Sequence, residues 1–73
     1  MFMDSFNKII KYLESELKIQ DVVTYYAVIK TAEDNDLWNI LVAHFASRDW
    51  LDVKIINNFE HDDLVEMRIG KKL

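Results

Sequence analysis

The sequence predicts a small α+β domain in which an amino-terminal amphipathic helix packs on an antiparallel meander of three or four strands. Three observations support this. Apolar residues recur at helical spacing near the amino terminus, β-branched and aromatic residues gather after them, and two later segments alternate between apolar and polar positions. A chain of 73 residues has room for one hydrophobic core, so residues 1–73 form a single domain.

The composition excludes several classes of site. The chain contains no cysteine, no proline and a single glycine, Gly70, so disulfide frameworks, thiolate metal sites and glycine-rich phosphate loops are excluded. A domain this short buries only about 60 % of the surface that its unfolded chain exposes. Because disulfides and thiolate-bound zinc cannot add stability here, we expect additional burial against a second chain.

The sequence predicts neither a targeting segment nor a membrane-spanning segment. An early acid, Asp4, and the lack of a basic stretch before an apolar run argue against a signal peptide. The longest apolar run, residues 40–46, is interrupted by His44 and is far shorter than the roughly 20 residues of a membrane span. The absence of cysteine fits a reducing compartment. We therefore expect a cytoplasmic protein without membrane attachment.

The first element is predicted to be a helix over residues 4–19. Either Asp4 or Ser5 can cap its first turn. Glu14 precedes Lys18 by four positions, which is the favourable order for an ion pair on a helix. Its apolar positions fall on one helical face and comprise Phe2, Phe6, Ile9, Ile10, Leu13 and Leu17.

The next segment favours a strand over residues 22–30, because it is rich in β-branched and aromatic residues. No glycine or proline separates it from the first helix, and its apolar spacing also suits a helical stripe, so a helix is the alternative. Residues 31–36 contain four short or acidic polar side chains in a row, which is typical of a connecting loop.

The remaining chain is predicted to form strands at residues 37–46, 50–57 and 63–70. For the last two, one antiparallel register places apolar residues opposite apolar residues and each charge opposite its counter-charge. The pairs of that register are Leu51 with Ile69, Val53 with Met67, Ile55 with Val65, Lys54 with Glu66 and Asp52 with Arg68. The earlier hairpin pairs Leu41 with Ile55, Ala43 with Val53 and Phe45 with Leu51. In the alternative, residues 38–46 form a second helix capped by Asp36.

In this sheet the odd-numbered residues form an apolar face that receives the helix. The opposite face is apolar in large part as well, and a contiguous apolar patch rimmed by charges is typical of an interface. We therefore predict a protein-binding face, most simply for a second copy of the chain in a twofold homodimer. Its residues are Trp38, Ile40, Val42, Trp50, Ile56 and Leu64.

Two polar groupings could carry chemistry, and each has a simpler interpretation. The predicted registers place His44 beside Asp52 and Asp52 beside Arg68, but no hydroxyl lies in that row, so a polar cross-strand ladder is favoured over a catalytic triad. A loop with Glu60, His61, Asp62 and Asp63 lacks the spacing of a calcium loop and the second histidine of a zinc site, so it is interpreted as a solvated turn. We predict no catalytic residues, no metal and no cofactor.

The sequence therefore predicts a non-enzymatic protein-interaction module, an accessory regulator or inhibitor of another protein. Small acidic chains of bacteria and their phages are often of this type. The alternative is nucleic-acid binding, in which Trp38, Trp50 and Tyr26 would stack on bases. A net charge of −4 and scattered lysines argue against that alternative, since affinity for nucleic acid depends on neutralising phosphates.

Overall fold

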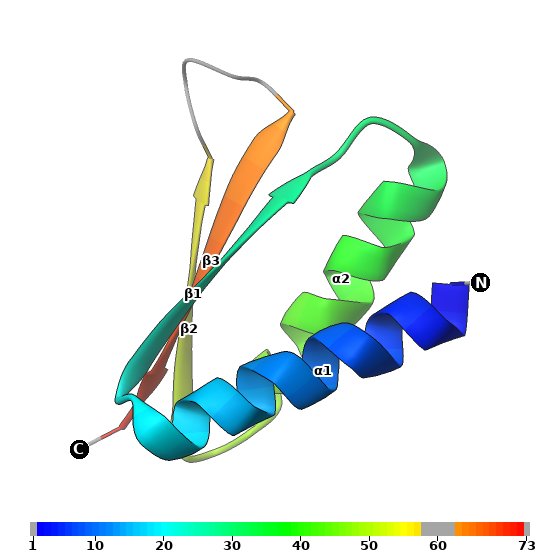
Figure 1. The fold of residues 1–73 in the computed structure, drawn as a ribbon. Helices are drawn as coiled ribbons and strands as arrows, with labels where there is room; N and C mark the ends of the chain where they lie inside the picture. Colours follow the sequence, from blue (N-terminus) through cyan, green and yellow to red (C-terminus); the bar gives the residue numbers. More distant parts are fainter. Residues whose placement is uncertain (1, 58–62, 73) are drawn as a thin grey trace.

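The computed structural model of the chain describes residues 2–57 and 63–72. Helices alternate with strands along the chain (Figure 1). The elements are α1 (Phe2–Ile19), β1 (Val22–Val28), α2 (Ala32–Ala46), β2 (Leu51–Asn57) and β3 (Leu64–Lys71). The predicted α+β class is confirmed, with two helices in place of one. Neither helix in the described part of the chain is long and apolar enough to cross a membrane.

The three strands form one sheet in the order β1-β3-β2. Strand β3 lies in the centre and runs antiparallel to both neighbours, so β1 and β2 run parallel to each other. Helix α2 connects these two parallel strands, and β3 fills the gap between them, which makes a split βαβ unit. The predicted meander is therefore wrong in its strand order.

Helix α1 confirms the predicted amino-terminal helix. Its residues Ile10, Leu13 and Leu17 are buried, as the helical spacing required. The predicted strand after it is also confirmed, since β1 covers Val22–Val28, and the helical alternative for this segment is wrong. The inward residues of β1 lie opposite the inward residues of β3; Val23, for example, pairs with Ile69.

The predicted strand at residues 37–46 is wrong, and so is the predicted loop at 31–36, because both belong to helix α2. The helical alternative is right in kind, but the cap is Thr31 and not Asp36. The Thr31 hydroxyl accepts a hydrogen bond from the Asp34 N–H at 3.0 Å, and Asp34 Oδ2 accepts one from the Thr31 N–H at 3.3 Å. This reciprocal capping box satisfies backbone donors that a helix start leaves unpaired.

Helix α2 packs against the sheet through one apolar face. The packed positions recur at steps of three and four residues, which fits a helix better than the alternation required of a strand. Trp38, Leu41 and Phe45 are buried, and Leu37 and Val42 pack against them. The predicted hairpin between residues 41–45 and 51–55 therefore does not form.

The register of β2 on β3 differs from the prediction by two residues. Val53 lies opposite Ile69, and Ile55 opposite Met67, so apolar residues still face each other. The predicted charge pairs are wrong, because Lys54 lies opposite Arg68. A shift of two residues leaves every side chain on the same face. The hydrophobic alternation therefore could not distinguish the two registers, and charge pairs of about 0.2–1 kcal/mol each did not decide between them.

Both helices cover the same face of the sheet, formed by its odd-numbered residues (Figure 1). This confirms the predicted core face. The buried residues come from all five elements and comprise Ile10, Leu13, Leu17, Val23, Trp38, Leu41, Phe45, Leu51, Met67 and Ile69. In the described part of the chain, no helix covers the opposite face, so the molecule is a two-layer structure with one sheet surface open.

The capping box generates a stability prediction. Replacing Thr31 by alanine removes the hydroxyl acceptor at the start of α2, and we expect the free energy of unfolding to fall by about 1 kcal/mol. Urea unfolding followed by circular dichroism measures this loss. Asn39→Ala changes an exposed position of the same helix that makes no capping bond, and it should not destabilise the chain. Equal losses in the two variants would contradict the assigned role of Thr31.

Candidate interaction surface

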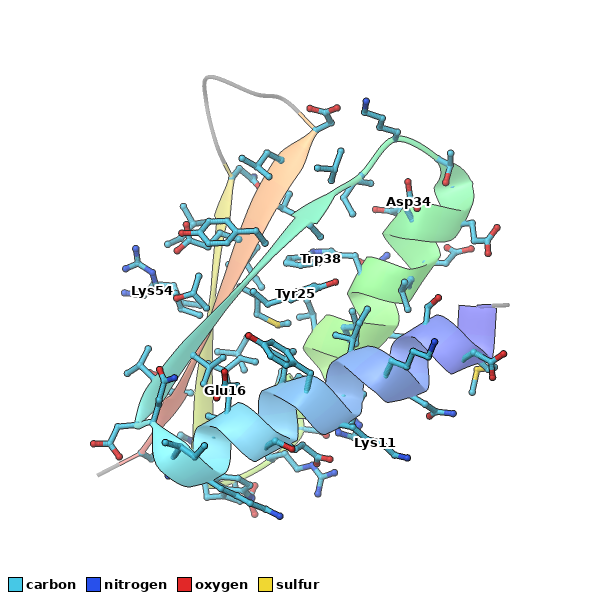
Figure 2. The ribbon with its side chains drawn as sticks, in the orientation of Figure 1. Lys11, Glu16, Tyr25, Asp34, Trp38 and Lys54 are labelled. Atoms are coloured by element: carbon cyan, nitrogen blue, oxygen red, sulfur yellow. The ribbon has the colours of Figure 1, made fainter. Side chains whose placement is uncertain are left out.

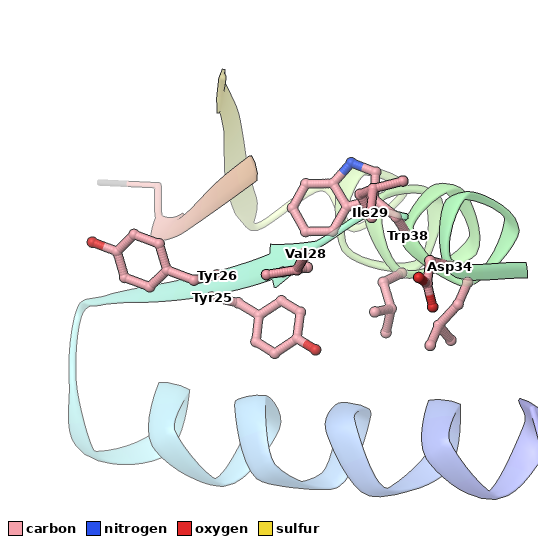
Figure 3. Close-up of a pocket in the computed structure, with 9 residues that line it drawn as sticks. Tyr25, Tyr26, Val28, Ile29, Asp34 and Trp38 are labelled. Carbon is pink, nitrogen blue, oxygen red and sulfur yellow. The ribbon is translucent and has the colours of Figure 1, made fainter. Parts of the chain in front are cut away.

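The uncovered face of the sheet is apolar along β1. The side chains of Val22, Tyr26 and Val28 point away from the helices and are 55 %, 60 % and 50 % exposed. Figure 3 shows Tyr25 turned toward α1 and Tyr26 turned to the opposite side of the strand. An antiparallel strand with one solvated face normally carries polar residues on that face. Strand β1 departs from this rule at three of its seven positions.

The uncovered surface, here called the open face, has an apolar end and a charged end. At the apolar end Val28 lies opposite Leu64, and in the next row Glu66 lies between Tyr26 and Ile56. At the charged end Arg68 lies between Thr24 and Lys54, and Lys54 points away from the helices (Figure 2). Arg68 Nε donates to Glu66 Oε2 at 2.7 Å, so this pair joins the two rows. The open face comprises Val22, Thr24, Tyr26, Val28, Asp52, Lys54, Ile56, Leu64, Glu66 and Arg68.

The backbone of β1 also has a free edge. The Ile29 N–H donates to the Asp63 carbonyl at 2.7 Å, and the Lys71 N–H donates to the Asp21 carbonyl at 2.9 Å. In an antiparallel ladder the direction of the backbone groups alternates, so the odd-numbered positions of β1 bond to β3 and the even-numbered ones point outward. No described residue bonds to those outward groups, which belong to Val22, Thr24, Tyr26 and Val28.

The free edge of β1 lacks the features that usually prevent strands from pairing with other chains. Edge strands are normally protected by charged side chains, proline or bulges. The seven residues of β1 include no charge and no proline, and six of them are β-branched or aromatic. The other edge strand, β2, carries Asp52 and Lys54. Of the two edges of the sheet, β1 is therefore the one suited to further strand pairing.

The six residues predicted to form one interface do not share a face. Only Ile56 and Leu64 lie on the open face, where both are half-buried. Trp38 is 7 % exposed in the core, and Ile40 and Val42 lie on α2. Trp50 is exposed and lies immediately before β2, outside the sheet. The expectation of a shared sheet face is wrong because residues 32–46 are helical, so their side chains no longer alternate across a sheet.

The outward residues of β1 were not among the predicted interface residues. The one signal in the sequence is that β1 is apolar at odd and even positions alike and has no charge. A buried strand between two layers shows the same pattern. Only the strand order places β1 at an edge, with one face uncovered.

Between β1 and α2 lies a small cleft of about 250 Å³ (Figure 3). The rings of Tyr25 and Trp38 stack in its wall, with centroids 6.3 Å apart and planes 19° apart. Asp34, also in the lining, is already engaged in the cap of α2. Typical small-molecule sites span roughly 300–1,000 Å³ and hold convergent polar groups. This cleft is smaller, and the carboxylate of Asp34 is engaged in the helix cap, so the cleft does not support a substrate site.

The predicted row of His44, Asp52 and Arg68 does not form. His44 lies on α2, where Nε2 is 3.8 Å from Glu14 Oε2 and its ring meets that of Phe6 edge-on at 6.0 Å. Asp52 lies opposite Gly70 in the sheet. The polar ladder is wrong for the same reason as the hairpin, because the segment that carries His44 is a helix.

The nearest hydroxyl to His44 in sequence, that of Ser47, is directed elsewhere. Ser47 Oγ donates to the His44 carbonyl at 3.0 Å, so it is not held against the imidazole. Of the predicted acidic turn, residues 60–62 lie outside the described residues. Asp63 is described, and its carbonyl accepts the hydrogen bond from Ile29. Within residues 2–57 and 63–72, no cluster of three or more histidine or acidic side chains is arranged to hold a metal ion.

Comparison of the chain with protein-family models, with curated proteins and with solved structures finds no match. The assignment of function therefore depends on the open face and on the free edge of β1.

The partial burial of Tyr25 generates a pH prediction. Burial raises the pKa of Tyr25 above its ordinary value of 10.0, because desolvation disfavours the phenolate. As the pH rises above 10.0, the unfolded chain loses this proton first, so the free energy of unfolding should fall until the pH passes the folded-state pKa. Below this pH range the phenol is protonated in both the folded and the unfolded chain, so Tyr25 causes no loss of stability there.

Urea unfolding at about pH 8 and about pH 11 tests this coupling. Tyr25→Phe should lose less stability between the two pH values than the wild-type chain does. Tyr12→Phe, at an exposed position of α1, serves as the matched control and should behave like the wild type. An identical pH dependence in all three chains would show that Tyr25 does not contribute.

Proposed function

We propose that this protein is a small non-enzymatic protein-interaction module that acts as an accessory regulator or inhibitor of another protein, and that it binds through the open face. The main evidence is the outward side of β1, where Val22, Tyr26 and Val28 are each at least half exposed and form an apolar strip. Contiguous exposed apolar residues bordered by charges are typical of protein interfaces, and tyrosine is enriched there.

The surroundings of this apolar strip fit a protein partner. Ile56 and Leu64 extend it across the sheet, and the paired Glu66 and Arg68 border it with charge. A partner would cover the apolar end while the charged end stays in contact with water, which is the usual arrangement of core and rim. A non-enzymatic role is supported by the hydrogen bond of Ser47 Oγ to the His44 carbonyl, which directs this hydroxyl away from the imidazole.

Nucleic-acid binding receives less support than the sequence suggested. The nucleic-acid alternative required Trp38 and Trp50 to lie beside Tyr26, but of these three residues only Tyr26 lies on the open face. The basic side chains there, Lys54 and Arg68, are accompanied by Asp52 and Glu66, and the chain as a whole is acidic. Phosphate binding requires a surplus of positive charge along the contact.

The proposed function is tested by capture with matched variants. A tagged chain is incubated with an extract of the cells that produce it, and the proteins retained are quantified by mass spectrometry. We expect Tyr26→Lys to lose the specific partner, because it places a charge in the centre of the apolar strip. Tyr12→Lys makes the same change at 57 % exposure on α1, compared with 60 % for Tyr26, and should retain the partner.

Circular dichroism of both variants establishes that each is folded. Partners retained equally by wild type and Tyr26→Lys would place the binding surface elsewhere. Loss in both variants would also contradict the proposal, because the effect would then not depend on the open face. Binding of single-stranded oligonucleotide at low salt, followed by tryptophan fluorescence, would favour the nucleic-acid alternative.

A further inference from the structure

We infer that the free edge of β1 pairs with β1 of a second copy of this chain, so that two three-stranded sheets join into one sheet of six strands. The inference deepens the proposed function and rests on it for the role of the joined open face. It starts from the outward N–H and C=O groups of Val22, Thr24, Tyr26 and Val28, which bond to no described residue. Unpaired groups of this kind form a template for another strand.

The alternation of backbone groups selects one register for such a pairing. Two copies related by a twofold axis must pair antiparallel, and only even-numbered residues can exchange hydrogen bonds across the seam. Centring the axis on Tyr25 places Val22 opposite the second copy's Val28, and Thr24 opposite its Tyr26. This register pairs all four outward residues of each strand. A shift by one pair in either direction leaves one outward residue of each copy beyond its partner's strand.

The charged residues that flank β1 do not face like charges in this register. Asp21 immediately precedes the strand, and Lys30 follows two positions after its end; both are exposed. An antiparallel pairing about Tyr25 places Lys30 of one copy opposite Gln20 of the other, and Asp21 opposite Ile29, at both ends of the seam. The strand between them carries no charge. Two copies of this acidic chain can therefore meet here without opposing like charges.

The joined sheet would also unite the two open faces. A twofold axis perpendicular to the sheet keeps both helical layers on one side and both open faces on the other. Tyr26 of each copy would then lie diagonally across the seam from its counterpart, with Val22 of one copy beside Val28 of the other. The apolar strip would become continuous across the seam, and its area would double, which gives the partner of the proposed function a larger surface to cover.

The first test is the mass of the full chain by sedimentation equilibrium over the micromolar to millimolar range. We expect twice the single-chain mass of 8.7 kDa. Thr24→Pro should return the mass to one chain, because it removes an N–H that points outward and bonds to no described residue. Proline is tolerated at such edge positions, and the residue before it, Val23, is already extended.

Ile55→Pro is the matched control for this substitution. The Lys72 N–H donates to the Trp50 carbonyl at 3.0 Å, so the odd-numbered positions of β2 point away from β3. Ile55→Pro thus removes an outward N–H from the opposite edge of the sheet, and the double mass should remain. Circular dichroism shows whether each proline variant keeps the fold.

The second test uses the absence of cysteine from the natural chain. Thr24→Cys and Tyr26→Cys chains, mixed and oxidised, should form a disulfide-linked heterodimer, because opposite residues of antiparallel strands lie within disulfide range. Each variant alone should cross-link far less, because in this register residue 24 does not lie opposite residue 24 of the second copy, nor residue 26 opposite residue 26. A mixture of Tyr26→Cys and Ile56→Cys should not cross-link, because Ile56 lies on β2 at the opposite edge of the sheet.

The outcomes separate this inference from the proposed function. A single-chain mass throughout the concentration range, or a dimer insensitive to Thr24→Pro, overturns β1 pairing. If capture of another protein still depends on Tyr26 in that case, the proposed function stands without the dimer. If β1 pairing is found but Tyr26→Lys and Tyr12→Lys capture the same proteins, the open face is not the binding surface and only the proposed function fails.

Discussion

Met67 and Ile69, on the central strand β3, are the residues on which the rest of the structure depends. Both are fully buried, and each faces an inward residue of β1 on one side and of β2 on the other. Helices α1 and α2 pack over the same surface, so the two side chains lie at the junction of all five elements. A core this small has a single centre, and each element must bury its apolar residues there.

This constraint explains why the second face of the sheet stays uncovered. The chain has only two helices in its described part, and closing the core requires both of them on the odd-numbered side of β3. No element is left for the even-numbered side, although Val22, Tyr26 and Val28 are as apolar as many core residues. The exposed edge of β1 arises in the same way, because β3 occupies the position between the two parallel strands.

The parts of the fold predicted from the sequence were those fixed by short-range periodicity. The α1 stripe and the alternation in β2 and β3 gave the right elements and the right core face. A strand is predicted at residues 37–46 because its apolar residues can pair with those of residues 51–55 in one antiparallel register. That pattern did not weigh the capping box of Thr31 and Asp34, or the helical spacing of Trp38, Leu41 and Phe45. The capping box and the continuous stripe favoured the helix over local strand preference.

The sequence by itself determined the α+β class, the inward face of the sheet and the absence of cysteine. These follow from composition and from patterns that span a few residues. The strand order, the two-residue shift of β2 on β3 and the position of β1 at an edge were decided only by the tertiary structure. The open face and the edge therefore could not be recognised from the sequence, because an apolar strand looks the same whether a second layer, a partner or water lies over it.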